Sequence, residues 1–324
     1  GSCFTPFARS QENMRWLSAL KRRLACSLRE RVPLASMTTW GVEGRARYFA
    51  SPARDGDLSA IMEVWEHESF PLWILGGGSN VLPLGGELPG LTVRVERSQE
   101  LSFSSDSRGG VVVDAPGGMF LPFLLGVLAR RGWSGCEPLA GIPGTLGGAV
   151  VGNAGGSDGA IGDVVAWVDT VEPGGIRRRW EEGDLRWEYR RCNLHEGTRI
   201  VVRCALRLSP SNSAEVGERI RSAMVRRRRQ PLGRKTAGSV FKNPEGLFAG
   251  ALLEGCGCKG MSCGGARVSE IHANFIENDK NATGEEILAL IRECRRRVKE
   301  TYGVLLELEV QVWGDAPEEA LGIY

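Results

Sequence analysis

The sequence predicts an α+β protein with more than one domain. Segments with the two-residue period of strands and segments with the helical period follow one another along most of the chain. The 324 residues are enough for two or three hydrophobic cores. A hydrophobic content of 42% with 25% charged residues is typical of a globular fold. A net charge of only +2 gives no support for nucleic acid or an anionic membrane as a partner.

The first 80 residues read as two helix–strand pairs. We expect a helix over residues 11–31, because four apolar side chains recur on one side of it: Trp16, Leu17, Leu20 and Leu24. Residues 37–52 read as a turn and a short strand. Residues 55–70 start with capping-type residues and then carry apolar positions at helical spacing, which predicts a second helix. An apolar strand at residues 71–75 runs into a glycine turn.

The rest of the chain keeps mixing strands and helices. The expected elements are strands at 91–96 and 110–116, a helix at 120–132, strands with a hairpin over 161–207, helices at 214–229 and 283–303, and a strand at 304–314. A stretch of small polar residues at 209–218 has the character of a domain boundary. We therefore expect three parts: a helical extension (1–30), a region of two α/β subdomains (31–208) and a C-terminal α/β domain (209–324).

The nine cysteines favour a reducing compartment. Their number is odd and they are scattered, which is typical of free thiols in the cytoplasm. We find no basic segment followed by a long apolar one, so a secretory signal is not expected. No apolar run approaches the roughly 20 residues that span a bilayer. Cys256, Cys258 and Cys263 lie near His272, but their spacing does not match zinc ligands. Ordinary thiols are favoured there, and we expect no metal site.

Glycine, with 44 residues, is unusually frequent and is clustered in two loops. LGGGSN at residues 75–80 follows a strand, so its amide groups are either an anion-binding nest or a plain tight turn. It lacks the last glycine and the helix of a dinucleotide fingerprint, and no P-loop motif occurs. GIPGTLGGAVVGNAGG at residues 141–156 describes a shaped ribbon of backbone. Ligand contact through main-chain amides is favoured there over a structural hinge.

Taken alone, several polar residues have ordinary structural interpretations. Ser239 lies in TAGSVFKNP (236–244) and reads as a surface hydroxyl on a strand flanked by turns. Arg190 reads as a surface arginine in an ion pair. Glu307 and Glu309 alternate with apolar residues, so both are expected on the solvent face of a strand. The basic run at 219–231 reads as a solvated helix end, with a phosphate contact as the alternative.

Seven motifs, however, occur together in one order. They are TTWGVEGRA (38–46), LGGGSN (75–80), EPLAGIPGTLGGAVVGNAGG (137–156), EYRRCNL (188–194), RRQPLGRKTAGSVFKNP (228–244), GCKGMSCGGARVSEIHANFIEN (257–278) and LELEVQVWG (306–314). In this order they resemble the UDP-N-acetylenolpyruvoylglucosamine reductase (MurB) family over nearly the whole chain from about residue 35 to 314. The resemblance implies an FAD-binding domain of the vanillyl-alcohol-oxidase (PCMH) type followed by an α/β substrate-binding domain. It is closer to the branch without the extra tyrosine loop.

The resemblance also implies a reaction. NADPH reduces a non-covalently bound FAD, and the hydride then passes to C3 of UDP-N-acetylglucosamine enolpyruvate, which becomes UDP-N-acetylmuramate for peptidoglycan synthesis. Arg190 matches the residue that holds the developing negative charge, Ser239 the proton donor to C2, and Glu309 the glutamate that assists. A cytoplasmic monomer is expected. Guanidinium suits a dianionic enolate because it offers planar, paired donors.

Binding residues follow from the same matches. Those implied for FAD are Gly76, Gly77, Gly78, Ser79, Asn80, Gly141, Ile142, Pro143, Gly144, Thr145, Gly147, Gly148, Asn153 and Gly155. Those implied for substrate are Tyr189, Asn243 and Lys259. Two positions depart from the family pattern: Cys192 replaces a serine, and Glu43-Gly44 replaces a glycine pair.

Two other functions remain open. One is an FAD-dependent oxidase of the same flavin fold, many of which attach FAD covalently through histidine or cysteine. Before residue 208 the only histidines are His67, on a predicted surface helix, and His195, and neither lies in a glycine loop. The other is a non-catalytic module that binds flavin or a nucleotide sugar. Such a module would not require a proton donor, so the presence of Arg190, Ser239 and Glu309 argues against it.

Overall fold

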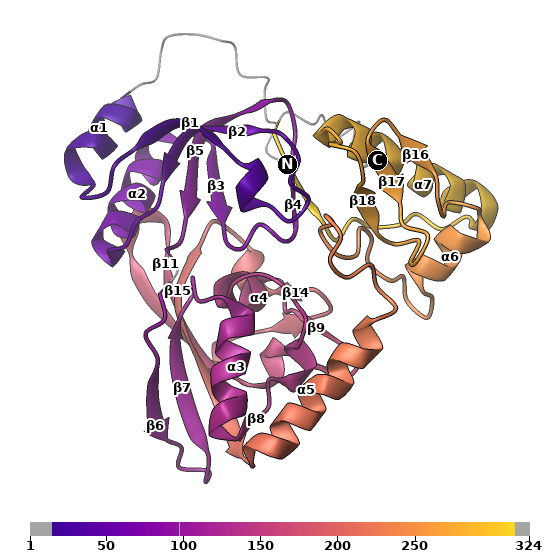
Figure 1. Cartoon of the computed structure of the whole chain (residues 1–324). Coiled ribbons are helices and arrows are strands. Elements are labelled where there is room, and N and C mark those ends of the chain that lie inside the picture. Colours follow the sequence, from indigo (N-terminus) through magenta and orange to yellow (C-terminus); the bar gives the residue numbers. More distant parts are fainter. Residues whose placement is uncertain (1–14, 97, 315–324) are drawn as a thin grey trace.

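The computed structural model describes residues 15–96 and 98–314 of the chain (Figure 1). They form three units, which we call the first unit (residues 15–96), the second unit (98–229) and the C-terminal unit (230–314). Each unit combines a sheet with helices, and hydrophobic clusters fill their interiors. The predicted α+β class is therefore what the structure has. None of the described helices is long and apolar enough to cross a membrane.

The first unit is a four-stranded sheet with two helices. Its elements are α1 (Arg15–Arg23), β1 (Arg29–Pro33), β2 (Arg45–Ala50), α2 (Asp55–Glu68), β3 (Leu72–Leu75), β4 (Val81–Pro83) and β5 (Glu87–Arg94). The strand order is β1-β2-β5-β3, in which β2, β5 and β3 are parallel and β1 is antiparallel. Trp16, Leu17 and Leu20 bury α1 against Ile61 of α2 and its neighbours, as their spacing predicts.

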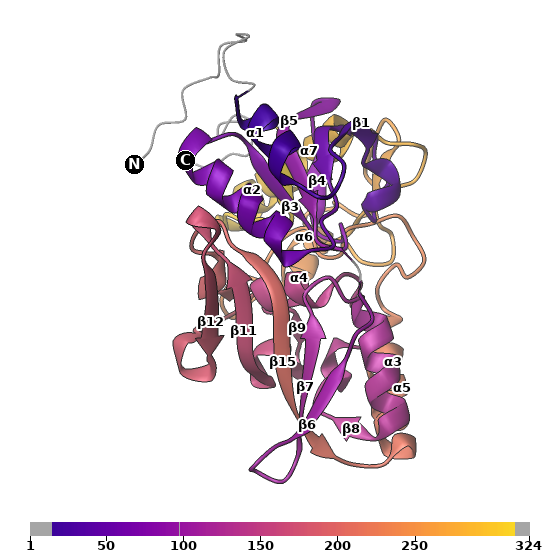
Figure 2. The ribbon, with the colours of Figure 1, turned by 90° about the vertical axis from the view of Figure 1, so that its left-hand side faces the viewer.

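The second unit is built on a six-stranded antiparallel sheet. Its strands are β6 (Ser102–Ser105), β7 (Val111–Pro116), β8 (Trp133–Ser134), β11 (Val165–Val171), β12 (Arg177–Glu181) and β15 (Ile200–Pro210). Its helices are α3 (Leu121–Arg131), α4 (Leu146–Val151) and α5 (Ser213–Arg227), and its short hairpin strands are β9 (Gly155–Gly156), β10 (Gly159–Ala160), β13 (Trp187–Glu188) and β14 (Arg191–Cys192). Helices α3 and α5 lie side by side along this unit in both views (Figures 1 and 2).

The C-terminal unit packs two helices against short strands. Its elements are α6 (Ala249–Gly255), β16 (Ser262–Cys263), β17 (Ala266–Val268), β18 (Ile276–Asn278), α7 (Gly284–Tyr302) and β19 (Gln311–Trp313). Helix α7 starts with a capping box, in which Thr283 and Glu286 bond each other's backbone N–H groups. Its buried face packs on β16–β18 and α6.

The C-terminal unit is joined to the first unit by more than one connection. Strand β19 pairs in parallel with β4, and Trp40 of the first unit is completely buried in the C-terminal core. The Trp40 indole donates to the carbonyl of Ile276 at 2.7 Å, and Asn278 Nδ2 donates to the Trp40 carbonyl at 2.9 Å. The two units therefore share part of one core.

Four expected elements differ in the structure. The N-terminal helix ends at Arg23, because the next free N–H groups, of Ala25 and Cys26, donate to the carboxylate of Asp57; residues 11–14 lie outside the described part. Asp57 is thereby used for this contact and does not cap α2, whose N-cap Arg54 makes no side-chain bond.

The other differences lie around the second and C-terminal units. The glycine ribbon contains the short helix α4, capped by Thr145, which we did not predict. The polar stretch 209–218 is mostly the end of β15 and the start of α5, whose N-cap is Asn212. Helix α5 contacts α3, which favours a domain boundary after it; the boundaries themselves stay predictions. The last strand is short, because residues 304–310 pair with the chain at 240–242 only through one isolated bridge, between Phe241 and Leu308.

Candidate active site

Arg190 lies in a tight two-residue turn between β13 and β14. The turn needs a left-handed backbone, and Arg190 has φ +59°, which an L-residue adopts only where its surroundings hold it. Two contacts do so: Arg190 donates through Nη1 to the carbonyl of Gly155 at 2.9 Å, and Asn153 donates through Nδ2 to the carbonyl of Glu188, also at 2.9 Å. The second glycine loop therefore positions this arginine.

Arg190 forms an ion pair with Glu309. The Arg190 Nε and Glu309 Oε1 atoms are 2.8 Å apart, and the two side chains are only 24% and 18% exposed. The Nε–H is buried and is not aligned for a hydrogen bond to any described group, so the attraction is one of charge. Because water is largely excluded, this attraction is stronger than that of a surface pair.

Glu309 and Glu307 have different environments. We expected both on the solvent face, and this is wrong for Glu309; the Glu307 side chain is 72% exposed and pairs with Lys242. Burial raises the pKa of the Glu309 carboxyl, while the charges of Arg190 and Lys242 partly oppose the rise. Residues 304–310 are not a regular strand, since they pair with residues 240–242 only through the isolated bridge between Phe241 and Leu308, and the two glutamates take different partners.

Ser239 lies on the segment next to Glu309. The N–H of Glu309 donates to the carbonyl of Val240 at 2.8 Å, so the residue after Ser239 holds the backbone of Glu309. Ser239 is half-buried, and its hydroxyl makes no hydrogen bond within the described residues. Gly238 has φ +77°, and a Cβ placed on it would meet no atom within 4 Å. The space beside Gly238 is therefore open.

The three residues implied for substrate binding are only partly brought together. The Asn243 N–H donates to the Tyr189 hydroxyl at 3.4 Å, which joins the β13–β14 turn to the C-terminal unit. The Asn243 Oδ1 is already taken by the N–H of Ala249 at the start of α6. Lys259 pairs with Glu254 at 2.8 Å. Tyr189 and Asn243 are therefore brought together, while Lys259 makes no hydrogen bond to either.

The two glycine loops pack directly against each other. A Cβ on Gly76 would lie 2.7 Å from the Thr145 hydroxyl, and one on Gly77 would lie 2.4 Å from Cα of Gly144. The Ser79 hydroxyl donates to the carbonyl of Pro143 at 3.2 Å. Side chains at positions 76 and 77 would push the loops apart, which explains why glycine occupies them.

These loops expose a row of unused backbone donors. Within the described residues, the N–H groups of residues 76–80, Gly144 and Thr145 donate no hydrogen bond. Adjacent free amides in glycine-rich turns form an anion-binding concavity. The diphosphate of a dinucleotide such as FAD requires donors of this kind, so the residues present fit that cofactor.

Other implied cofactor residues are engaged within the protein. The N–H of Gly147 donates to the carbonyl of Gly117 at 2.7 Å, and Asn153 uses both ends of its amide, toward Glu188 and Gly162. The Asn80 side chain donates to the carbonyl of Glu309 at 2.9 Å. These residues shape the loops and position the neighbouring chain.

Arg227 and Lys242 were missed from the sequence. Arg227 lies at the end of α5, half-buried against Gly141, and burial together with the charge of Arg190 lowers its pKa. The solvated helix end that we expected is therefore wrong for Arg227, although Arg228 and Arg229 are exposed. Lys242 follows Phe241 and adds positive charge near Glu309. No local signal distinguishes either residue from its basic neighbours; only the folded geometry does.

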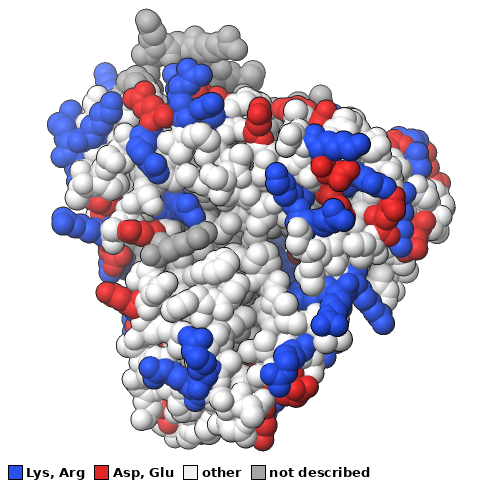
Figure 3. Space-filling view, in the orientation of Figure 1, with Lys and Arg blue, Asp and Glu red and all other residues white. Residues whose placement is uncertain are grey.

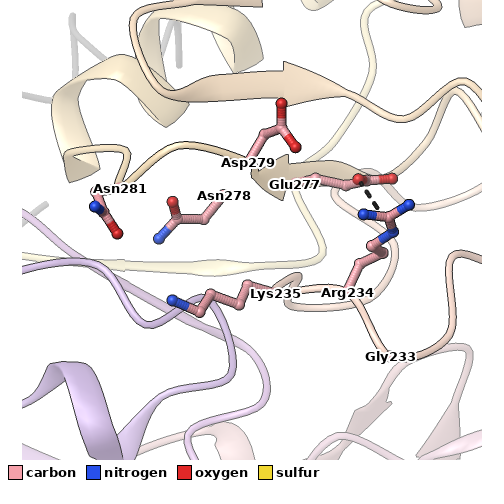
Figure 4. A pocket seen from close by; sticks show the side chains of 7 residues that line it. All are labelled: Gly233, Arg234, Lys235, Glu277, Asn278, Asp279 and Asn281. Carbon is pink, nitrogen blue, oxygen red and sulfur yellow. Dashed lines mark ion pairs between the residues drawn. The ribbon is translucent and has the colours of Figure 1, made fainter.

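All eight cysteines of the described residues are free thiols, and no group of three or more possible metal ligands gathers in that part of the chain. A polar cavity of about 210 Å³ lies between residues 233–235 and 277–281 of the C-terminal unit (Figure 4), and none of the predicted site residues lines it. Basic and acidic side chains are interspersed over the face in Figure 3, in keeping with the small net charge.

Comparisons with known proteins agree with this geometry. A family model described as FAD binding domain matches residues 46–180, and one described as UDP-N-acetylenolpyruvoylglucosamine reductase, C-terminal domain, matches residues 230–313. The UDP-N-acetylenolpyruvoylglucosamine reductase of Moorella thermoacetica is 41% identical over 304 residues, 92% of this chain and 99% of the relative. That of Synechococcus elongatus strain PCC 7942 is 39% identical, covering 89% and 95%. The crystal structure of MurB from Thermus caldophilus has a TM-score of 0.75 at 34% identity, covering 89% and 99%.

The fold and the donor-lined loops define a flavoprotein, with an FAD-binding domain followed by a smaller α/β unit. Within that class, the identity over nearly the full length of both chains decides the family. The chain belongs to the UDP-N-acetylenolpyruvoylglucosamine reductase family.

Proposed function

We propose that this chain reduces UDP-N-acetylglucosamine enolpyruvate to UDP-N-acetylmuramate with NADPH and non-covalent FAD. The observation that carries the proposal is the junction of three segments, which brings the Arg190–Glu309 ion pair beside the backbone of Ser239. A fixed cation, a half-buried hydroxyl and a carboxyl with a raised pKa suit a reaction in which negative charge develops and is then protonated.

The two glycine loops would hold FAD. The free N–H groups of residues 76–80, Gly144 and Thr145 are available to its diphosphate, and the open space at Gly238 leaves room for the reacting end. Bound there, FAD would supply the hydride-transfer chemistry that links NADPH to C3 of the enolpyruvyl group.

Arg190 would stabilise the charge that develops on the substrate. Addition of hydride at C3 leaves a carbanion at C2, which is delocalised into the adjacent carboxylate. The contacts of Arg190 with Gly155 and Glu309 fix its guanidinium before the reaction, so no reorganisation is needed when the charge appears. The partner carboxylate also prevents an isolated buried cation.

Ser239 would donate the proton to C2. A serine hydroxyl is a weak acid, so it can act only toward a strongly basic carbanion held against it. Glu309, on the adjacent segment and with a raised pKa, is suited to assist at the same centre. Tyr189 and Asn243, which are joined by a hydrogen bond, would contact the substrate, and so would Lys259, which follows α6 in the C-terminal unit.

Two finer features complete the proposal. The chain would act as a monomer in the cytoplasm, where its eight described thiols remain reduced. Light scattering coupled to size-exclusion chromatography checks the first point, and a mass near twice 35.2 kDa would contradict it.

The test separates the two halves of the reaction. The purified protein should absorb near 450 nm, lose that absorbance with NADPH and regain it with the enolpyruvyl substrate. Ser239→Ala should still be reduced by NADPH, but its reoxidation by substrate should slow by about 10²–10⁴-fold. Ser262→Ala, on exposed β16, is the matched control and should behave as wild type in both halves.

Each rival gives a different result. A protein that binds no added FAD would contradict the whole proposal, and normal reoxidation of Ser239→Ala would contradict the proton-donor role. Flavin that stays with the protein after acid denaturation would favour the covalent oxidase. Bound flavin that neither NADPH nor substrate changes would favour the non-catalytic module.

A further inference from the structure

The segment that carries Glu309 is clamped onto the first glycine loop. The Asn80 side chain donates to the Glu309 carbonyl at 2.9 Å, and the N–H of Gln311 donates to the Asn80 carbonyl at 2.9 Å. Beyond Gln311, strand β19 pairs with β4, which begins directly after Asn80. Asn80 is therefore where the glycine loop and the C-terminal segment first meet.

All three polar groups of Glu309 are fixed by different parts of the chain. Its N–H donates to Val240, beside Ser239; its carboxylate pairs with Arg190 of the second unit; its carbonyl accepts from Asn80 of the first unit. The first two contacts join Glu309 to Arg190 and to the neighbour of Ser239, which are the other two residues of the proposed reaction. The Asn80 contact alone relates Glu309 to the loop with the free backbone donors.

We propose that Asn80 is a positioning residue, which couples the occupied cofactor loop to Glu309 and so sets where this carboxyl stands relative to Ser239. The inference rests on the proposed function of the site. The backbone N–H of Asn80 is free for a diphosphate, whereas its side-chain amide is committed to Glu309. One residue thus serves two contacts, and a ligand that orders the loop also orders the Glu309 segment.

This arrangement predicts a specific kinetic pattern. Without the Asn80 amide, Glu309 keeps its pair with Arg190 but loses its tie to the loop, and a displacement of about 1 Å is enough to cost about 10²-fold. Asn80→Ala should therefore slow reoxidation of the flavin by substrate about 10–100-fold, at saturating FAD, while reduction by NADPH changes little. In a Glu309→Gln background the same change should have almost no further effect, because Asn80 acts through Glu309.

Hydrogen exchange tests the coupling without catalysis. In the wild type, adding FAD should slow amide exchange in the peptide with residues 306–314, and in Asn80→Ala this protection should be lost although FAD still binds. Ser262→Ala, exposed on β16, is again the control, and FAD should still protect the peptide in that variant.

Three results would overturn the inference. They are protection by FAD that persists in Asn80→Ala, equal loss in both half-reactions, and full additivity with Glu309→Gln. A wild-type enzyme that the substrate cannot reoxidise would instead contradict the proposed function, and the exchange experiment would still decide the role of Asn80.

Discussion

Glu309 illustrates how a single carboxyl serves function at a cost in stability. Its burial disfavours the charged form, and the nearby cations only partly compensate. Such groups are typical of active sites, where an adjusted pKa is useful and a fully solvated carboxylate would not be.

The sign of this cost gives a pH-dependent prediction. The pKa of Glu309 is raised in the folded state from an ordinary value of 4.5, so the folded protein binds this proton more tightly than the unfolded chain. The stability that protonation of Glu309 contributes to the fold is fully present below pH 4.5, and it is lost as the pH rises through the folded-state pKa. Glu309→Gln, which mimics the protonated form, should match the wild type near pH 4 and melt at a higher temperature near pH 8.

Thermal unfolding of both proteins across this range measures the difference. Activity should fall in the variant at every pH. A melting temperature below that of the wild type at pH 8 would show that the Arg190 ion pair outweighs the burial of the charge.

Residue type and spacing alone could not identify this site. Alternation placed Glu307 and Glu309 on one face, but residues 304–310 are not a regular strand and the two side chains have different partners. Arg190 looked like any surface arginine, because its left-handed turn is held by Asn153 and Gly155, which are distant in sequence. The ordered motifs, not the individual residues, identified the family.

At the scale of elements, the glycine loops show how backbone shape replaces side-chain chemistry. Gly77→Ala should place a Cβ 2.4 Å from Cα of Gly144, so the loops must separate. We expect FAD affinity to fall at least about tenfold and stability to fall by about 1–3 kcal/mol. Flavin absorbance after gel filtration and thermal melting measure both effects.

Gly56→Ala is the matched control for this change. Gly56 lies in α2, and a Cβ there would meet no atom within 4 Å. The variant should bind FAD normally and gain up to about 1 kcal/mol from helix propensity. Equal flavin loss in both variants would show that the close approach of Gly77 to Gly144 does not control FAD binding.

Element positions were predictable where local pattern decided them. Helices α2, α3 and α7 and the β11–β12 hairpin follow from apolar spacing and turn residues. The end of α1 did not, because Asp57, some 32 residues away, takes the next N–H groups. Helix α4 did not either, since a glycine pair normally disfavours a helix and is tolerated here by close packing of Gly147 on Gly117.

At the scale of the whole molecule, Trp40 ties the first unit into the C-terminal core. It is completely buried, and its indole donates to Ile276. Trp40→Ala should lower the free energy of unfolding by about 3–5 kcal/mol. Denaturant titration followed by circular dichroism measures this loss.

The exposed Ile176, on a turn of the second unit, supplies the comparison. Its side chain is 63% exposed, so Ile176→Ala should change stability by no more than about 0.5 kcal/mol. If Trp40→Ala were as mild, the two units would not depend on their shared core.

The clamp between Asn80 and the Glu309 segment has a consequence during protein synthesis. These residues are 229 positions apart, so at roughly 5–20 residues per second the ribosome needs about 10–45 s to make the second after the first. During that interval strand β4 has no β19 to pair with, and the carboxyl is still absent. A nascent chain can bury the cores of its first two units in this time, but it acquires a complete catalytic centre only when its last described strand emerges.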